Sequence, residues 1–522
     1  MKNQLTIVQM NDSHAYMALH PELFWEQGRV VYRKAGGYAR IAALVNEIRA
    51  ERGGEVLFVD GGDTFHGTYP AVESKGEALL PVMNALGLHG MTAHWEFAYT
   101  PVGFQKLASR LNYSMLAMNV YHQDSRQLLF KPYEVIETGG LRIGLAGIAS
   151  NIVDKNMPAK FSEGIFFTDG RQELPGVIDR LRGEEKVDLV VLVSHLGFPQ
   201  DLQLMKEIPG VDVDLSAHTH HRLLAAVKQG TALVTQSGSH GSFLTRIDLT
   251  VDNGKVTDYS HRLIEVGEAI EPDPRVQEMV RAALQPHAEM LDEVVGETRL
   301  PLDRGRVLES TMDNLLVQAL RSHTGAQIAF SNGWRYGAPV IPGPVTVNDL
   351  YNMAPMNPPV STVEFSGAEL KQMLEENLES TFSTDPFRQM GGYVKRADGI
   401  RVFFGAGKFG HMFYESTARD GRKDVFSPVR AQRIDWIKAT LEHPTAALFE
   451  GWDKTSRQYD ATRRVAVVYE DFVVVVAMRL KQDGSLKANF VTCYQADNSI
   501  GKIRSSPVWS RAACLRLLGG SP

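Results

Sequence analysis

Aspartate and histidine side chains recur in four short motifs of this sequence. The motifs are Asn11-Asp12-Ser13-His14, Asp60-Gly61-Gly62-Asp63, Ser194-His195 and Ala217-His218-Thr219-His220. In the D-x-H and H-x-H spacings, alternate side chains of an extended chain point the same way. Imidazole and carboxylate groups are ligands for divalent ions such as Mn²⁺, Fe²⁺ and Zn²⁺. One such motif is a weak signal, but four in succession predict a metal site.

Two metal ions would give these residues a hydrolytic chemistry. Ions about 3.5–4 Å apart stabilise both the attacking and the leaving oxygen of a displacement, and a shared carboxylate is the usual bridge. We predict that Asp63 is this bridge. The sequence has two cysteines, Cys493 and Cys514, far from the motifs. A disulfide scaffold is therefore excluded, and the ligands must be nitrogen and oxygen atoms.

Each motif follows or ends an apolar segment with β-strand character. Helix-like segments such as Tyr38–Arg49 and Phe104–Leu111 separate the strands. The predicted strands are Leu5–Met10, Val56–Asp60, Ile143–Gly147, Asp188–Val193 and Val211–Ala217. This alternation is typical of an α/β layered domain, expected over residues 1–268. Such sheets place their sites beyond the carboxyl ends of the strands, where the motifs stand.

The sequence changes character near residue 270. Asp273 is predicted to cap a helix whose first position is Pro274. Residues 269–415 are predicted to form a second α+β unit, and residues 416–522 a third, small α+β region. The predicted elements are helices near Met312–Ser322 and Gly367–Leu378, and antiparallel strands at Arg464–Tyr469, Phe472–Arg479 and Lys487–Tyr494.

The composition limits the classes of protein to which this chain can belong. A chain of 522 residues with 43% hydrophobic and 22% charged residues is ordinary for a soluble globular protein. It has no run of about 18 apolar residues, so we expect no membrane span. The net charge of -6 gives the main domains no reason to bind nucleic acid. The N-terminus has no secretory h-region, which predicts a cytoplasmic protein, or an exported one if a leader has been removed.

The four motifs resemble those of the calcineurin-like metallophosphoesterases, and more closely their 5′-nucleotidase branch. That branch has N-D-x-H, G-D-x-x-x-G-[ST] (here Gly62 to Thr68), S-H-x-G (Ser194 to Gly197) and H-x-H motifs in this order. The resemblance implies a four-layer αββα domain followed by a 5′-nucleotidase-type C-terminal domain. It implies two divalent ions, manganese first and zinc or iron as alternatives. The implied ligands are Asp12, His14 and His220 for one ion and His94, His195 and His218 for the other, with Asp63 between.

The block around residue 94 departs from the family pattern. The family usually has G-N-H-E-F-D, where Asn binds metal and His donates a proton to the scissile group. This chain has Ala93-His94-Trp95-Glu96-Phe97-Ala98. His94 then takes the ligand position, and Trp95, which cannot act as a general acid, replaces the catalytic His. The H-W-E-F block resembles the thiosulfohydrolases of the bacterial sulfur-oxidation (Sox) system, which are dimanganese enzymes. Another residue, His66 or His240, is an alternative acid.

A second motif, Ser331-Asn332-Gly333-Trp334-Arg335-Tyr336-Gly337, resembles the loop of the 5′-nucleotidase C-terminal domain that grips the anionic group of the substrate. The planar fork of Arg335 suits an oxyanion, although a surface salt bridge is an alternative role. The closing G-G-D-G block of that domain is missing, so the domain is predicted to be incomplete. The predicted catalytic residues are Asp63, His94 and Arg335, and the predicted substrate-binding residues are Asn332, Arg335 and His240.

Three functional hypotheses follow. The first is a metal-dependent hydrolase of phosphate esters, a phosphoric monoester hydrolase acting on nucleotides or similar small molecules. The second is a sulfohydrolase that releases sulfate from a cysteine S-thiosulfonate on a carrier protein, as the His94-Trp95 block implies. The third places the function in residues 416–522, as a toxin-like or interaction protein. That region faintly resembles phage-associated, nuclease-linked domains, but a structural or oligomerisation module is the preferred interpretation.

Overall fold

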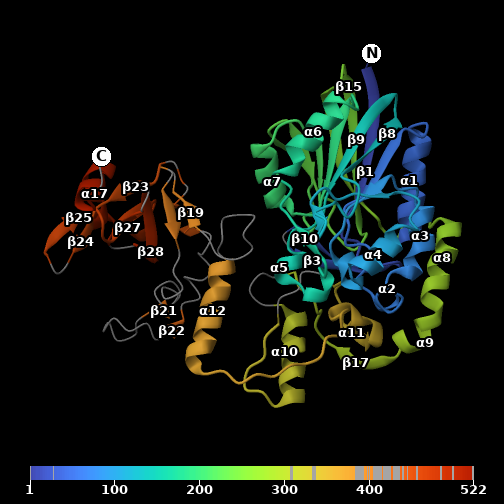
Figure 1. The fold of residues 1–522 in the computed structure, drawn as a ribbon. Coiled ribbons are helices and arrows are strands. Elements are labelled where there is room, and N and C mark those ends of the chain that lie inside the picture. The colour runs from blue at the N-terminus through green and yellow to red at the C-terminus, as the bar shows by residue number, and fades with distance from the viewer. Residues whose placement is uncertain are drawn as a thin grey trace. The chain divides into compact units, whose positions relative to one another are not determined.

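The computed structural model describes residues 2–27, 29–305, 310–331, 337–381, 393–396, 398, 400–403, 414–415, 425–426, 436–437, 440–441, 443, 445–453, 456–481, 485–496 and 499–519. The chain divides into two compact units, Met1–Thr362 and Val363–Pro522. Each unit is described by itself (Figure 1).

Two six-stranded sheets form the centre of the first unit. The first contains, in order, β16 (Lys255–Glu265), β15 (Phe243–Asp252), β1 (Lys2–Met10), β4 (Val56–Asp60), β5 (Gly90–Met91) and β6 (Ser114–Met115). The second contains, in order, β13 (Val227–Gln229), β14 (Ala232–Thr235), β12 (Val213–Ser216), β11 (Leu189–Ser194), β9 (Leu141–Ile148) and β8 (Tyr133–Thr138). Parallel pairs run from β1 to β6 and from β14 to β9.

The two sheets pack face to face, with helices on their outer sides. Ile7 of β1 lies in one apolar cluster with Val191 of β11 and Leu215 of β12, so this cluster lies between the sheets. The next residue, Val8, faces the opposite side and packs in the cluster that contains helix residues such as Ile41, as the two-residue period of a strand requires. The helices α1 (Tyr38–Glu51), α3 (Leu80–Ala85) and α8 (Pro274–Leu284) lie on one side, and α6 (Glu173–Gly183) and α7 (Phe198–Glu207) on the other (Figure 1). The expected four-layer αββα arrangement is confirmed.

The four central strands that carry motifs end at the predicted residue or one residue from it. Strands β1, β4, β11 and β12 end at Met10, Asp60, Ser194 and Ser216, at or directly before the metal motifs. Every residue of β4 and β11 is buried. Parallel strands covered on both faces need such continuous apolar segments. The strands therefore deliver their polar C-terminal residues to one edge of each sheet.

Residues 269–362 belong to the first unit. Asp273 caps α8 by accepting a hydrogen bond from the Val276 N–H, and Pro274 is the first helical residue, as predicted. A small apolar cluster that includes Leu302, Met312 and Val340 holds this segment together. Its other elements are α9 (Ala288–Leu291), β17 (Val294–Thr298), α10 (Thr311–Thr324), β18 (Gly343–Thr346) and α11 (Val347–Met353).

Shorter elements complete the first unit. They are the hairpin β2 (His20–Glu26) and β3 (Arg29–Ala35), the strands β7 (Val120–His122) and β10 (Ile165–Phe167), the helices α2 (Tyr69–Glu73), α4 (Pro101–Ala108) and α5 (Val153–Asn156), and the 3-10 turns η1 (Glu77–Leu79), η2 (Trp95–Tyr99), η3 (Ala159–Phe161) and η4 (Gln285–His287).

The second unit contains a third six-stranded sheet. Its order is β19 (Tyr393–Lys395), β20 (Arg401–Phe403), β28 (Leu486–Gln495), β27 (Phe472–Leu480), β26 (Val465–Tyr469) and β23 (Ala447–Phe449). The predicted antiparallel order of the last strands is observed. The remaining elements are α12 (Gly367–Thr381), β21 (Tyr414–Glu415), β22 (Val425–Phe426), β24 (Gly451–Asp453), β25 (Gln458–Asp460), α16 (Ile500–Arg504) and α17 (Arg511–Leu517).

The predicted domain boundaries stay predictions, but two observations bear on them. The division between compact units falls at residue 362, and residues 269–362 belong to the unit that carries the αββα domain. The third sheet joins strands from both sides of residue 415, because β20 pairs with β28. Among the described residues, no helix is long and apolar enough to cross a membrane.

Candidate metal centre

Two loops at the ends of β1 and β4 are joined by their backbones. The Asp12 N–H donates to the Gly62 carbonyl at 2.9 Å, and the His14 N–H donates to the Asp63 carbonyl at 2.8 Å. Gly62 has a φ of +87°, and a Cβ there would lie 2.6 Å from the Thr92 carbonyl oxygen. This position therefore requires glycine. The two aspartates are held side by side before any ion binds.

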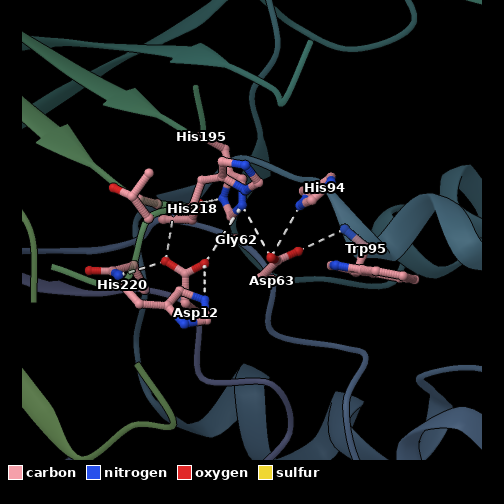
Figure 2. A network of polar contacts seen from close by, with 12 residues as sticks. Asp12, Gly62, Asp63, His94, Trp95, His195, His218 and His220 are labelled. Carbon is pink, nitrogen blue, oxygen red and sulfur yellow. Dashed lines mark hydrogen bonds and ion pairs between the residues drawn. The ribbon is translucent and has the colours of Figure 1, made fainter. Parts of the chain in front are cut away.

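Seven side chains converge in two groups at this edge, and all of them are buried except His220, which is half-buried. One group contains Asp63, His94, His195 and His218, and the other contains Asp12, His14 and His220. The ligand atoms within each group lie within 4.8 Å of one another. These seven residues are the ones predicted as metal ligands, and Figure 2 shows the histidines gathered around the Asp12 and Asp63 carboxylates.

The Asp63 carboxylate lies between the two groups. Its Oδ2 is 3.2 Å from His94 Nδ1 and 3.2 Å from His195 Nε2, within its own group. The same oxygen is 3.9 Å from His14 Nε2 of the other group. The other oxygen, Oδ1, accepts a 2.7 Å hydrogen bond from the backbone N–H of Trp95. This placement is what a bridging carboxylate needs.

The second group is organised around Asp12 and two imidazoles. His220 Nε2 lies 3.2 Å from Asp12 Oδ1 and 3.2 Å from His14 Nε2. The Asp12 Oδ2 accepts hydrogen bonds from the Asn11 side-chain amide at 2.7 Å and from the His218 N–H at 2.9 Å. Oδ1 is thus the oxygen that faces the imidazoles.

The hydrogen bonds of two imidazole rings leave one nitrogen of each ring available to coordinate a metal ion. His195 Nδ1 donates to the Gly61 carbonyl at 2.6 Å, and His14 Nδ1 lies 3.3 Å from the His66 carbonyl. A ring nitrogen that donates outward leaves the other nitrogen with its lone pair free for a metal, as is common for histidine ligands. In both rings the Nε2 atoms are those that face the carboxylates.

The charges of the site favour a cation. Burial raises the pKa of Asp63, but the imidazoles of His94 and His195 outweigh it and hold the pKa of that carboxyl well below its usual range. Burial lowers the pKa of His195, but Asp63 and Asp12 outweigh it and raise the pKa to about 10. Two buried carboxylates thus draw a proton onto a nearby imidazole. A divalent ion would supply that positive charge and leave the imidazole neutral.

Unpartnered atoms give an independent test of the fit. His94 Nε2 is buried and has no hydrogen-bond partner among the described residues. Asp12 Oδ1 and His195 Nε2 are also buried and make no hydrogen bond among the described residues, although each lies 3.2 Å from a ligand of the opposite charge type. Buried polar atoms without a partner are costly, and functional sites are where they occur. The nitrogen and oxygen donors, their burial and these free atoms fit two divalent ions of the kind that imidazole and carboxylate ligands prefer.

Five of the seven side chains stand on strained backbone. The φ angles are 49° at Asp12, 47° at His14, 56° at Asp63, 72° at His218 and 57° at His220. This left-handed region is uncommon for residues other than glycine, and such strain concentrates at functional sites. The loops around the motifs therefore turn more sharply than extended strands would.

Glu96 is a site residue that was not predicted from the sequence. Its Oε2 accepts a 2.8 Å hydrogen bond from the His94 N–H, and its Oε1 accepts a 2.7 Å bond from the Thr64 N–H. The side chain is fully buried and ties the loop of His94 to the loop of Asp63. Its place in the H-W-E-F block was the available signal.

Sequence comparison agrees with this geometry. Residues 289–402 match the model of the 5′-nucleotidase C-terminal domain. The trifunctional nucleotide phosphoesterase protein YfkN of Bacillus subtilis is 23% identical over 448 residues, which are 77% of this chain and 29% of that protein. By these matches the chain is similar to 5′-nucleotidases and nucleotide phosphoesterases.

Solved structures show the same fold. A 5′-nucleotidase precursor from Thermus thermophilus is similar with a TM-score of 0.64 at 24% identity, and the match covers 94% of this chain and 89% of that one. The sulfate thiohydrolase SoxB from Thermus thermophilus gives a TM-score of 0.68 at 24% identity, over 74% of this chain and 81% of that one. Members of the branch depend on two metal ions, which agrees with the two ligand groups.

The remaining predicted site residues lie outside the seven ligands. Asn332 and Arg335 lie outside the described residues. His240 is buried and lies in a third group with His20 and Glu22. His20 was not predicted to belong to any site, but its side chain is largely buried within this group.

This third group is a poor metal site. Glu22 Oε1 pairs with the Arg222 guanidinium at 2.8 Å, and Glu22 Oε2 accepts hydrogen bonds from His240 Nδ1 at 3.0 Å and from the Ser242 hydroxyl at 2.9 Å. A guanidinium already neutralises the carboxylate, so the group needs no ion.

Trp95, predicted to replace the catalytic His of the family, lies over His66. The two rings stack with centroids 4.9 Å apart. His66 Nε2 is 2.9 Å from Met356 Sδ, and its Nδ1 is buried without a partner among the described residues. His66 therefore lies beside the candidate metal centre, in contact with Trp95.

Proposed function

We propose that this chain is a two-metal hydrolase of phosphate monoesters, with nucleotides as its substrate class and manganese as its metal. The observation that carries the proposal is the Asp63 carboxylate, whose Oδ2 faces imidazoles of both ligand groups. The similarity to a nucleotide phosphoesterase and to a 5′-nucleotidase structure supports the substrate class. Zinc and iron are the alternative metals.

Each side chain of the centre has a stated task in this proposal. Asp12, His14 and His220 would hold one ion, and His94, His195 and His218 the other, with Asp63 between. Two such ions supply the Lewis acidity that activates water and stabilises the leaving oxygen. The Trp95 N–H fixes the Asp63 carboxylate through Oδ1, and Glu96 fixes the backbone of His94.

Residues of the second predicted domain are proposed to bind the substrate. Arg335 is proposed to bind its anionic group, and Asn332 is a further proposed substrate-binding residue. A guanidinium donates two parallel hydrogen bonds to such a group. Arg335→Ala should then lower kcat/KM by roughly ten- to a hundredfold.

A second candidate function rests on the His94-Trp95 pair. His94 stands in the ligand group, and the neighbouring Trp95 indole cannot donate a proton as a general acid. A sulfur-centred substrate with a good leaving group has less need of that proton. The alternative is hydrolysis of a cysteine S-thiosulfonate with release of sulfate, and the substrate would then be carried on a protein.

The experiment compares the two substrate classes on one preparation. Purified protein loaded with Mn²⁺ is assayed with a panel of nucleoside monophosphates and with a cysteine S-thiosulfonate peptide, and Asp63→Asn serves as the control. Phosphate release from nucleotides that the control loses supports the first function. Sulfate release alone transfers the proposal to the second. Activity that survives in Asp63→Asn contradicts both.

A further inference from the structure

Two aromatic side chains of the second unit are exposed side by side. Trp452 lies on β24 and Tyr459 on β25, and the two residues are directly opposite each other in this hairpin, so their side chains share a face. Their rings meet edge to face with centroids 5.1 Å apart. Trp452 is 47% exposed and Tyr459 is 41% exposed. Large aromatic side chains usually bury most of their area, so this pair is a candidate binding surface.

The hairpin that carries the pair is fixed to the chain that follows it. β24 and β25 form a two-stranded sheet of their own in the second unit (Figure 1). A Cβ at Gly451, directly before Trp452, would overlap the carbonyl oxygens of Arg463 and Arg464, so the strand lies against this backbone. The Asp460 carboxylate, directly after Tyr459, accepts hydrogen bonds from the Thr462 N–H at 2.6 Å and from its hydroxyl at 2.7 Å. A ligand would therefore meet a surface that is already ordered.

The charged side chains beside the aromatic pair differ in their exposure. The arginines Arg457, Arg463 and Arg464 are exposed. The aspartates Asp453 and Asp460 are half-buried. Arg463 Nη1 lies 3.5 Å from Asp453 Oδ2, but the arginine side chain is 69% exposed and that of the aspartate 16%. The guanidinium groups thus remain accessible to an anion, while the carboxylates lie further inside.

The wider region also has a positive charge. Residues 416–522 contain 17 lysine and arginine residues against 11 aspartate and glutamate residues. The whole chain has 55 of the first kind and 61 of the second, a net charge of -6. A positive region on a negatively charged chain indicates that the region binds an anionic partner.

We propose that this hairpin surface, formed by Trp452, Tyr459, Arg457 and Arg463, binds single-stranded nucleic acid. Exposed aromatic rings stack with unpaired bases, and neighbouring guanidinium groups bind the phosphates. Stacking of this kind needs no particular base, because every base has a flat face. Double-stranded DNA keeps its bases stacked within the duplex, so it should bind more weakly. The proposal is independent of the metal centre, whose ligands all lie in the first unit.

The residues between the two strands favour nucleic acid over a membrane as the partner. Residues 454–457 read Lys-Thr-Ser-Arg. A segment that inserts into a lipid surface needs a continuous apolar face. Charged and hydroxyl side chains between two aromatic residues do not supply one, whereas they suit a phosphate backbone.

The binding is measured by fluorescence anisotropy of the full-length protein with labelled oligo(dT) and oligo(U) of about 20 nucleotides. The oligonucleotides carry hydroxyl groups at both ends, so they offer no phosphate monoester to the proposed hydrolase. Trp452→Ala should weaken binding by about five- to a hundredfold, and Trp452→Phe by much less. Arg463→Ala should lower the slope of log affinity against log salt concentration by about 0.7.

The matched control is Trp25→Ala, which removes a tryptophan that is 66% exposed in the first unit. It should bind both oligonucleotides as the parent does, and so should Asp63→Asn, which alters the metal centre. Hydrolysis of nucleotides by Trp452→Ala should equal that of the parent, because Trp452 lies outside the ligand groups.

Two outcomes would overturn the proposal. One is the absence of saturable oligonucleotide binding, or an affinity that Trp452→Ala leaves unchanged. The other is binding of phosphatidylserine vesicles, lost in Trp452→Ala, by a protein that binds no oligonucleotide, which would assign the surface to a membrane. A parent that bound oligonucleotides but hydrolysed no phosphate ester would contradict the proposed function alone.

Discussion

Asp63 lies close to imidazoles of both ligand groups of the candidate metal centre. It is buried, faces imidazoles of both groups through Oδ2, and is held through Oδ1 by the Trp95 N–H. Asp63→Asn replaces a charged oxygen by an amide that cannot bridge two cations. We expect the protein to retain one ion or fewer where the parent holds two, as measured by elemental analysis of dialysed samples.

Asp214→Asn is the matched control for this metal measurement. Asp214 is an equally buried aspartate of the same unit and lies outside the ligand groups. Its variant should keep two ions. Retention of two ions in Asp63→Asn would contradict the bridging role.

Trp95 should control which leaving groups the enzyme expels. If no general acid stands at this position, esters with poor leaving groups react slowly while activated aryl phosphates react readily. Trp95→His should raise kcat on poor leaving groups by roughly tenfold or more and change kcat on aryl phosphates little. A series of esters of graded leaving-group pKa measures the slope, with the exposed Trp25 changed to His as control. An unchanged slope would mean that another group already donates the proton.

At the residue scale, the sequence predicted which side chains meet but not the backbone that presents them. The D-x-H and H-x-H spacings were interpreted as extended chain, in which alternate side chains share a face. Instead Asp12, His14 and His220 have positive φ angles. The motifs still converge because the strands before them end at one edge. Glu22 and His20 were missed because the third member of their group, His240, lies about two hundred residues further along the chain.

A buried acid pair, Asp214 on β12 and Asp201 on α7, lies in the first unit. Asp214 is 0% exposed, and neither of its carboxylate oxygens accepts a hydrogen bond from a described residue. Burial, with the nearby Asp201, holds the pKa of Asp214 well above its usual range. Burial also raises the pKa of Asp201 to about 7, although Ser194 opposes this.

This pair predicts how stability depends on pH. The folded state keeps a proton on Asp214 that the unfolded chain releases above a pKa near 3.8. The contribution of Asp214 to the stability of the parent should therefore fall as the pH rises above about 4. Asp214→Asn lacks this proton release, so it should be more stable than the parent by about 1–3 kcal/mol at pH 8 and by less at pH 5.

Urea unfolding at the two pH values measures the difference. Asp179→Asn, a change of an exposed aspartate on α6, is the control and should show no such pH dependence. An Asp214→Asn difference that stayed constant with pH would show that Asp214 is ionised in the folded protein.

At the element scale, the local sequence patterns predicted where the strands lie better than which strands pair with one another. A buried, apolar segment such as β11 can be recognised as a strand from its residues alone. The start of the helix at Asp273 could be predicted from the capping residue and from Pro274. The pairing of β20 with β28 did not follow, because a three-residue strand has no pattern of its own and its partner lies far along the chain. The predicted separation at residue 415 consequently falls within a sheet.

At the scale of the whole molecule, bound metal ions should stabilise the first unit and not the second. All seven predicted ligands lie in Met1–Thr362. Manganese at a hundredfold excess over its dissociation constant stabilises the state that binds it by about 2.7 kcal/mol per site. We expect slower hydrogen exchange in peptides that contain the four metal motifs. Peptides from β26 and β27 should not change, and equal protection there would contradict a site confined to the first unit.

The place of β28 in the third sheet has a consequence for synthesis on the ribosome. β20 lies between β19 and β28, so it presents an unpaired edge until β28 has been translated. An exposed strand edge is a template for wrong pairing with another chain. Parallel pairing across so long a stretch of chain is also intrinsically slow. A nascent chain that stalls after β27 would therefore expose the unpaired edge of β20. Protein truncated before Leu486 should aggregate for the same reason. Chains that end at Thr362 lack this strand and should not aggregate in this way.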